Sequence, residues 1–267
     1  MGKNIQKKNI KSGKDYHTKR KPRILFYDIE TAPLVSYTWG IWEVDVIEVK
    51  EEWYMLTFAY KWLGEKKTHV VSLPQFGLYK KDPKNDRELV KKLWSLFDEA
   101  DVIVAHNGLS FDNKKSNARF IQHNLPPPNP YKTIDTKLVA KRYFKFDSNK
   151  LDHLGQYFNL GRKMKHEGFS LWLGCMSGDK KAWNKMCLYN IQDVVLLEKI
   201  YLKMLPYMDN HPNTGLYLGE KHACPNCGSH MLQKRGVSHT RTSTSQRFQC
   251  NLCHAWSQSP LKGGQLR

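Results

Sequence analysis

The sequence predicts an α/β protein in which helices flank a mixed β-sheet, followed by a small module near the C-terminus that a metal ion stabilises. Short apolar runs of strand type alternate with helical spacing in the first part of the chain. Helical spacing then dominates, and two Cys-x2-Cys pairs follow near the C-terminus. The 267 residues, 40% of them hydrophobic, allow one sizeable domain with a packed core and a small appendage.

Strand-type runs are expected first. Residues Arg23–Ile29 form a short apolar run, and Glu52–Trp62 and Lys67–Leu73 form a hairpin around Gly64-Glu65. A helix is expected over Asp86–Phe97, where apolar residues recur at helical spacing. The run Asp101–Ala105 predicts another buried strand.

The remainder of the large domain predicts helices. Three consecutive prolines from Pro126 to Pro128 interrupt the pattern. Residues Pro206–Gly215 are rich in turn formers and indicate a linker. Five helices are expected to begin near Phe111, Asp135, Leu151, Lys180 and Tyr189.

The formal charge of +18 is concentrated at the two ends of the chain. Residues 1–23 carry +8 and residues 221–267 carry +7, which leaves +3 for the middle. This distribution favours a polyanionic partner, most plausibly nucleic acid, although a solvated tail that only aids solubility would look the same. The Lys-rich segment 1–22 lacks periodicity, and we expect it to be disordered until it binds a partner.

The first acidic pair lies at the end of the first predicted strand. Because side chains alternate along a strand, Asp28 and Glu30 point to the same face. Two neighbouring carboxylates repel each other unless a cation lies between them, and Mg²⁺ or Mn²⁺ prefers such oxygen ligands. Acid pairs at strand ends are also often simply solvated.

Two further segments carry acids beside apolar runs. Asp112 follows the strand Asp101–Ala105 and could equally be a first-turn or capping residue of the next helix. Tyr189 and Asp193 are four residues apart, so they share one face of an apolar helix. An acid beside core residues is costly unless something pairs with it, although a half-exposed helix would leave Asp193 in water.

The motifs Asp-Ile-Glu-Thr from Asp28, Asn-x3-Phe-Asp from Asn107 and Tyr-x3-Asp from Tyr189 occur in this order. Together they resemble the DEDD, or DnaQ-like, 3′–5′ exonuclease superfamily, whose fold is RNase H-like. Tyr189 is similar to the tyrosine subclass, because the histidine subclass would have His where this chain has Leu188. Residues 150–154 with 161–163 also resemble family B polymerase-type exonucleases of phages and bacteria. The resemblance covers roughly residues 23–205.

The resemblance implies that Asp28, Glu30, Asp112 and Asp193 hold two Mg²⁺ or Mn²⁺ ions. Two such ions can hold the attacking water and the leaving oxygen of a phosphodiester in line. Tyr189 would then orient the water. Asn107 and Phe111 match the second motif, so we expect nucleic-acid contacts there, with core packing as the alternative role of Phe111.

The two Cys-x2-Cys pairs are Cys224 with Cys227 and Cys250 with Cys253. Four thiolates at this spacing predict a zinc ribbon with one structural Zn²⁺. Gly228 suits the tight turn of the first pair, and His254 stands where glycine is more usual. The intervening segment is cationic and is expected to bind nucleic-acid backbone, with protein docking as the alternative, through Lys234, Arg235, Arg241 and Arg247. Cys175 and Cys187 are expected to be ordinary core residues.

The combined prediction is a metal-dependent 3′–5′ exonuclease acting on single-stranded or frayed 3′ ends of DNA, in replication, repair or recombination. RNA processing, structure-specific endonuclease cutting and a catalytically silent nucleic-acid-binding protein are the alternatives. A polymerase or another replication protein is a candidate partner. Neither a signal peptide nor a membrane span is expected, which predicts an intracellular, cytoplasmic protein. The expected divisions are residues 1–22, 23–205, 206–221 and 222–267.

Overall fold

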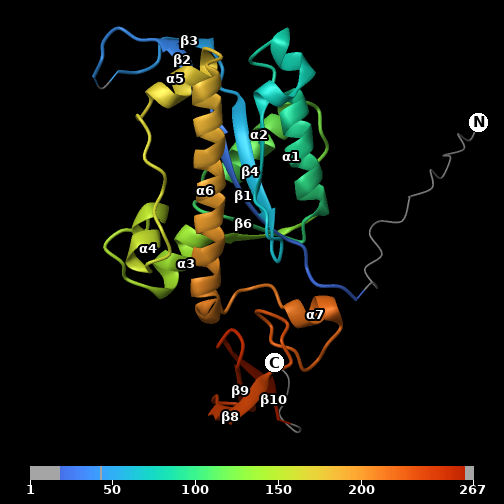
Figure 1. The fold of residues 1–267 in the computed structure, drawn as a ribbon. Coiled ribbons are helices and arrows are strands. Elements are labelled where there is room, and N and C mark those ends of the chain that lie inside the picture. Colours follow the sequence, from blue (N-terminus) through green and yellow to red (C-terminus); the bar gives the residue numbers. More distant parts are fainter. Residues whose placement is uncertain (1–18, 43, 262–267) are drawn as a thin grey trace, which may run out of the picture.

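A five-stranded mixed sheet forms the centre of the computed structural model, which describes residues 19–42 and 44–261 (Figure 1). Its order is β5-β4-β1-β6-β7. The central strand β1 (Ile24–Thr31) pairs antiparallel with β4 (Met55–Trp62) and parallel with β6 (Val102–Ala105). The edge strands are β5 (His69–Ser72) and β7 (Lys132–Asp135). The sheet confirms the predicted α/β class, and β4 and β5 form the expected antiparallel hairpin.

Helices cover both faces of this sheet (Figure 1). Leu25, Tyr27 and Ile29 of β1 share a core with α1 (Arg87–Glu99) and α2 (Asp112–Gln122). Ile24 and Phe26 share a second core with the other layer. That layer consists of α3 (Thr136–Tyr143), α4 (Leu151–Tyr157) and the C-terminal half of α6 (Lys180–Met204). The alternation along β1 therefore directs its even-numbered side chains, including Asp28 and Glu30, towards α6.

Helix α6 corrects one expectation about the chain. Two helices were expected to begin near Lys180 and Tyr189, whereas residues 180–204 form a single helix of 25 residues. The segment contains neither Gly nor Pro, so nothing in it interrupts the backbone hydrogen bonds. Asp179 caps its start by accepting a hydrogen bond from the Lys181 amide.

Several elements were not anticipated. An arm containing the short strands β2 (Val35–Tyr37) and β3 (Glu48–Glu51) is inserted between β1 and β4. Two 3₁₀ turns, η1 (Leu73–Gln75) and η2 (Gly77–Lys80), follow β5, and α5 (Ser170–Met176) packs against α6. Among the described residues, no helix combines the length and apolarity that crossing a bilayer requires.

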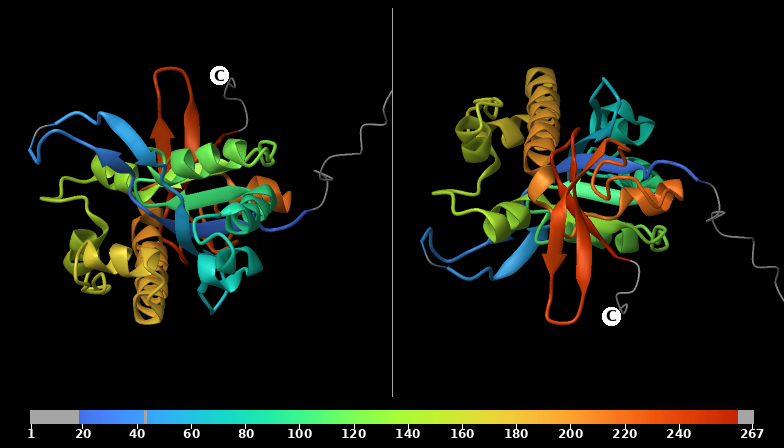
Figure 2. Two further views of the ribbon diagram at one scale, coloured as in Figure 1. Left: turned by 90° about the horizontal axis from the view of Figure 1, so that it is seen from above. Right: turned by 90° about the horizontal axis from the view of Figure 1, so that it is seen from below.

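The C-terminal part packs against the end of α6 (Figures 1 and 2). Residues expected as a linker contain η3 (Leu205–Tyr207) and α7 (Thr214–Leu218). A three-stranded antiparallel sheet follows, built from β8 (Leu232–His239), β9 (Thr244–Cys250) and β10 (Trp256–Pro260). The buried Asn226 amide donates to the carbonyls of Leu205, at 2.8 Å, and Met208, at 3.1 Å. The C-terminal module is therefore fixed to the large domain by buried hydrogen bonds.

The N-terminal segment expected to be disordered lies outside the described residues up to residue 18. The Arg20 guanidinium donates to Asp101 Oδ1 at 2.9 Å, and the Arg20 amide donates to the carbonyl of Tyr217 at 3.2 Å. Residues 19–22 are thus held between the sheet and α7.

A fully buried carboxylate, Asp86, joins three elements of the large domain. It precedes α1, and its Oδ2 accepts a hydrogen bond from the Met55 amide of β4 at 2.8 Å. Its Oδ1 pairs with Arg119 of α2 and lies 2.6 Å from Nε2 of His123, the residue that follows α2. One carboxylate therefore contacts two side chains from this helix and its C-terminal end. The pairing satisfies charges that would otherwise be buried without partners.

We expect Asp86→Ala to lower the free energy of unfolding by about 3–5 kcal/mol, because it leaves the partly buried Arg119 charge without its carboxylate partner. Urea denaturation followed by circular dichroism measures the change. Glu99→Ala is the matched control, since its ion pair with Arg23 is exposed and should contribute less than about 1 kcal/mol. An equal loss in both variants would contradict the assigned role of Asp86.

Candidate active site

Three of the sequence-predicted acids converge at the centre of the large domain. Asp28 and Glu30 come from the end of β1, and Asp193 comes from the middle of α6. One carboxylate oxygen from each lies within 4.8 Å of the others. The register between β1 and β4 shifts between Glu30 and Thr31, close to the end of β1. The strand end and the helix face therefore meet at one point.

Asp112 lies beside this group but outside the set of three. It is the first residue of α2, is 3% exposed, and its Oδ1 accepts a hydrogen bond from the Ile29 amide at 3.3 Å. After burial, the charge of Asp112 is the largest influence that raises the pKa of Asp28. Asp112 therefore occupies the first turn of the helix, as the sequence suggested, and also lies close to the other acids.

The crowding of these acids raises their pKa values. Burial, followed by the charge of Asp193, raises the pKa of Glu30 to about 8. Burial raises the pKa of Asp112 to about 7 and, together with the Asp112 charge, raises that of Asp28 well above its ordinary value. Burial also raises the pKa of Asp193. Without a divalent cation, the group therefore retains protons that isolated carboxyl groups would release near neutral pH.

Lys163 is a site residue that the sequence analysis did not identify. Its ammonium donates to the Tyr189 hydroxyl at 2.8 Å and pairs with Asp193 Oδ2 at 2.7 Å. Burial opposes its positive charge, but Asp193 and Tyr189 more than compensate and raise the pKa of Lys163. The residue lies between α4 and α5. It belongs to residues 161–163, which carry part of the resemblance, but the sequence analysis assigned it no role.

Asn190 is a second site residue without an assigned role in the sequence. It is fully buried, and its Nδ2 donates to Asp28 Oδ2 at 2.6 Å and to the Asp28 carbonyl at 3.2 Å. Its place inside the Tyr-x3-Asp motif is the signal that could have revealed it. Asn190 therefore fixes one oxygen of Asp28 and ties β1 to α6.

The residue set suits hard divalent cations. Carboxylate oxygens are the ligands that Mg²⁺ and Mn²⁺ prefer, and three separate acids present them at one point. The buried Asp193 Oδ1 has no hydrogen-bond partner within the described residues. A buried oxygen without a partner costs free energy, and coordination of a cation by this oxygen would remove that cost. Asp28, Glu30 and Asp193, with Asp112 beside them, therefore fit a magnesium or manganese site.

An aromatic hollow of about 410 Å³ adjoins the acids. Thr31, the residue after Glu30, forms part of its wall, and His166 and Trp172 form another part. The rings of His166 and Trp172 lie 5.0 and 6.2 Å from the ring of Tyr189. The remaining wall residues are Ala32, Pro33, Leu34, Trp53, Lys115, Gly168 and Phe169.

Asn107 and Phe111 flank the turn between β6 and α2. Asn107 has a positive φ of 69°, and its Oδ1 accepts a hydrogen bond from Lys137 Nζ at 3.0 Å. Phe111 is 40% exposed, so part of its ring is accessible to a ligand. The Lys115 ammonium lies 5.9 Å from its ring and 3.7 Å from the ring of Trp53.

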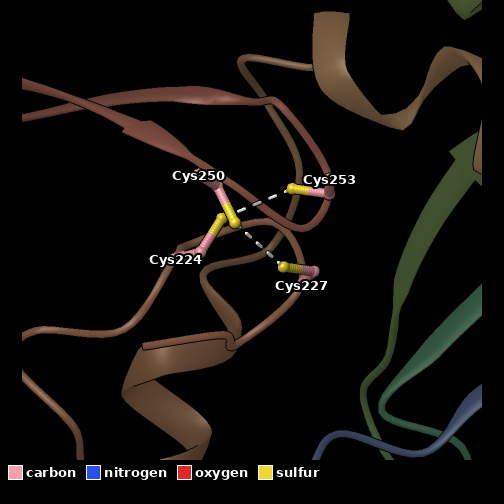
Figure 3. A group of neighbouring side chains, drawn as sticks. All are labelled: Cys224, Cys227, Cys250 and Cys253. Carbon is pink, nitrogen blue, oxygen red and sulfur yellow. Dashed lines mark hydrogen bonds between the residues drawn. The ribbon is translucent and has the colours of Figure 1, made fainter. Parts of the chain in front are cut away.

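The four cysteines near the C-terminus form a compact cluster (Figure 3). Cys224 Sγ lies 3.6 Å from Cys253 Sγ, and Cys227 Sγ lies 3.7 Å from Cys250 Sγ. These distances exclude disulfides, whose sulfurs are about 2.05 Å apart. A tetrahedral zinc site with Zn–S bonds of about 2.3 Å separates its sulfurs by about 3.8 Å, so the cluster fits Zn²⁺.

The turns of this cluster have the backbone conformations that the sequence suggested. Gly228 and His254 have φ values of 74° and 62°, so the histidine adopts the left-handed conformation in place of the more usual glycine. The four basic residues singled out in the sequence, Lys234, Arg235, Arg241 and Arg247, are all exposed. Outside the cluster, Cys175 is fully buried and Cys187 is partly buried.

A family B DNA polymerase from the hyperthermophilic archaeon Pyrobaculum calidifontis has a similar solved structure, with 17% sequence identity and a TM-score of 0.52. The match covers 70% of this chain and 25% of the polymerase chain. This chain therefore spans about a quarter of the length of the polymerase. At this identity the likeness shows the fold alone. No curated protein matched this sequence. A family model described as RNase_H superfamily matches residues 25–205, which is more than half of the chain, and the protein therefore belongs to the RNase_H superfamily.

Proposed function

We propose that this protein is a metal-dependent 3′–5′ exonuclease that removes nucleotides from the 3′ ends of DNA. Membership of the RNase_H superfamily supports a nuclease that hydrolyses nucleic acid. The observation that carries the finer proposal is the convergence of Asp28, Glu30 and Asp193, from β1 and α6, within 4.8 Å. The proposed 3′–5′ direction rests on the resemblance of the three acidic motifs, and of their order along the chain, to the DEDD exonucleases.

In this proposal, the four carboxylates would hold two divalent cations, which when bound would activate the attacking water and stabilise charge on the leaving 3′ oxygen. Tyr189 orients the attacking water through its hydroxyl. Burial, followed by the charge of Asp193, raises the pKa of Tyr189, so the phenol stays protonated and acts by donating a hydrogen bond rather than as a base. Lys163 fixes the Tyr189 hydroxyl, and Asn190 fixes Asp28.

The cysteine cluster is proposed to bind one structural Zn²⁺ and so to form a zinc ribbon. A segment of this size buries little surface by itself, and metal binding would supply most of its folding free energy. Its exposed basic residues are proposed to contact nucleic-acid phosphates and to hold the substrate on the enzyme. A polymerase or another replication protein is the proposed protein partner.

We expect Asp193→Asn to reduce hydrolysis by at least about 100-fold, because it removes charge stabilisation at the proposed metal site. The assay uses DNA labelled at its 5′ end with Mg²⁺ or Mn²⁺, and with EDTA as a blank. Leu202→Ala, on an exposed position of the same helix, is the control and should retain wild-type activity. Wild-type activity in Asp193→Asn would refute the site assignment.

The same assay separates the alternative functions. A ladder that shortens from the 3′ end by single nucleotides supports the exonuclease. Preferential degradation of matched RNA substrates would favour RNA processing, and cuts at branch points would favour a structure-specific endonuclease. Binding without any metal-dependent hydrolysis would leave only a nucleic-acid-binding protein.

The raised pKa values of the acids predict how pH affects the protein without Mg²⁺ or Mn²⁺. Glu30 and Asp112 have native pKa values of about 8 and about 7, above the values of about 4 that apply to the unfolded chain. Between these values the native state binds more protons than the unfolded state, so their contribution to stability falls as pH rises from about 4 to about 8. Thermal unfolding in buffer without Mg²⁺ or Mn²⁺, and without a chelator that would remove the proposed Zn²⁺, measures this trend.

Added Mg²⁺ requires ionised ligands, so we expect it to raise the melting temperature more near pH 8 than near pH 5. Asp28→Asn/Asp193→Asn should lose most of this pH-dependent gain. An increase of the same size at both pH values in the wild-type protein would contradict the proposed ligand set.

Salt dependence tests the proposed role of the basic residues in the ribbon. Each phosphate that a protein neutralises on single-stranded nucleic acid contributes about 0.7 to the slope of log affinity against log salt concentration. We expect the fourfold variant Lys234→Gln/Arg235→Gln/Arg241→Gln/Arg247→Gln to show a smaller slope, by about 0.7 for each phosphate that it no longer neutralises. Lys91→Gln/Lys92→Gln, on the exposed face of α1, is the control. An unchanged slope in the ribbon variant would favour protein docking instead.

A further inference from the structure

The arm between β1 and β4 exposes large apolar side chains to an unusual degree. Within its described part, residues 34–42 and 44–51, Trp39 is 92% exposed, Ile41 is 85% exposed and Trp42 is 81% exposed. Soluble proteins rarely leave contiguous apolar side chains of this size in water unless they bind something. The arm projects from the body of the molecule (Figures 1 and 2).

The arm continues directly from the wall of the aromatic hollow. Pro33 and Leu34 line the hollow, and β2 begins at the next residue, Val35. Trp172 lines the same hollow, and its ring packs near the Tyr189 ring. Aromatic surface therefore extends from the candidate active site, through the hollow, to the base of the arm.

The charges of the arm indicate which part of a ligand it can contact. Asp45 and Glu48 are exposed, and Glu51 pairs with Lys84 at 2.7 Å. Lys50 is the single basic residue in this stretch of sequence. An acidic surface repels phosphate groups, so a nucleic-acid ligand would approach through its apolar faces rather than its backbone.

We infer that Trp39 and Trp42 of the arm stack on unpaired bases of a single-stranded nucleic acid whose 3′ end occupies the candidate active site. The inference depends on the proposed function for the position of that end. Unpaired bases offer flat apolar faces, whereas base pairs in a duplex hide these faces in the stack. The arm thus contacts nucleotides on the 5′ side of the end and selects a single-stranded tail.

This mode of binding differs from that of the basic ribbon in its response to salt. Stacking on tryptophan involves no release of counterions, so its contribution to affinity is nearly independent of salt concentration. Contacts between lysine or arginine and phosphate weaken as salt rises. The arm and the ribbon therefore make separable contributions to binding.

The test measures binding of the full chain to fluorescent oligothymidylate of roughly 20 nucleotides, by anisotropy, without added Mg²⁺ or Mn²⁺, so that no hydrolysis occurs and the proposed Zn²⁺ is retained. We expect Trp39→Ala/Trp42→Ala to weaken binding by about 10-fold or more, since one stacked base contributes roughly 5- to 150-fold. The factor should be the same at about 50 and about 300 mM NaCl. Binding of a blunt duplex should not change.

Matched variants separate stacking from other effects. Trp39→Phe/Trp42→Phe keeps aromatic faces and should retain most of the affinity, whereas Trp39→Leu/Trp42→Leu keeps apolarity alone and should lose it. Leu216→Ala, at a position that is 78% exposed on α7, should have no effect. Circular dichroism of each variant verifies that the fold is retained.

Several outcomes would overturn the inference. They are unchanged affinity of Trp39→Ala/Trp42→Ala for the oligonucleotide, an equal loss for duplex DNA, or full binding by the leucine variant. Loss of self-association in sedimentation experiments, with oligonucleotide binding intact, would assign the arm to an interface between two copies instead. Because binding is measured without added Mg²⁺ or Mn²⁺, a wild-type protein that binds but does not hydrolyse would refute the proposed function and leave the arm's role standing.

Discussion

The structure depends on the mutual repulsion of carboxylates that the fold forces together. Strand β1 supplies Asp28 and Glu30, and α6 supplies Asp193 on the same side of the sheet. A fold gains nothing in stability from crowding acids in this way, because each one raises the pKa of its neighbours. The arrangement becomes favourable only with compensating positive charge. Lys163, which pairs with Asp193, supplies part of that charge, and the proposed divalent cations would supply the rest.

The continuous helix α6 connects this acidic group to the cysteine cluster. Asp193 lies in its middle, and Tyr201, near its C-terminal end, is fully buried and hydrogen bonds to His211 Nε2 at 2.7 Å. Cys227 and Cys253 pack against the core that contains Tyr201. The cluster therefore also shields one end of the helix that carries the acid.

The parts of the fold and site that the sequence predicted are those marked by local chemistry. Alternation along β1 was sufficient to place Asp28 and Glu30 on one face, and the spacing of the cysteines was sufficient to indicate their cluster. Residues 161–163 carry part of the resemblance, but the role of Lys163 escaped prediction because its partners, Tyr189 and Asp193, are 26 and 30 residues away. Strand β7 also escaped prediction, because it is only four residues long. The apolar residues of the arm resemble those of an ordinary core strand, and only the structure reveals that they are exposed.

Charge balance explains why one lysine cannot replace the metal ions in the proposed mechanism. When ionised, Asp28, Glu30, Asp112 and Asp193 carry four negative charges, and Lys163 neutralises one of them. A single divalent cation would still leave a net negative site, which repels the phosphodiester that must enter. Two divalent cations leave one net positive charge, equal and opposite to that of one phosphodiester group. Lys163 therefore suits a site that becomes attractive to substrate only when both cations are bound.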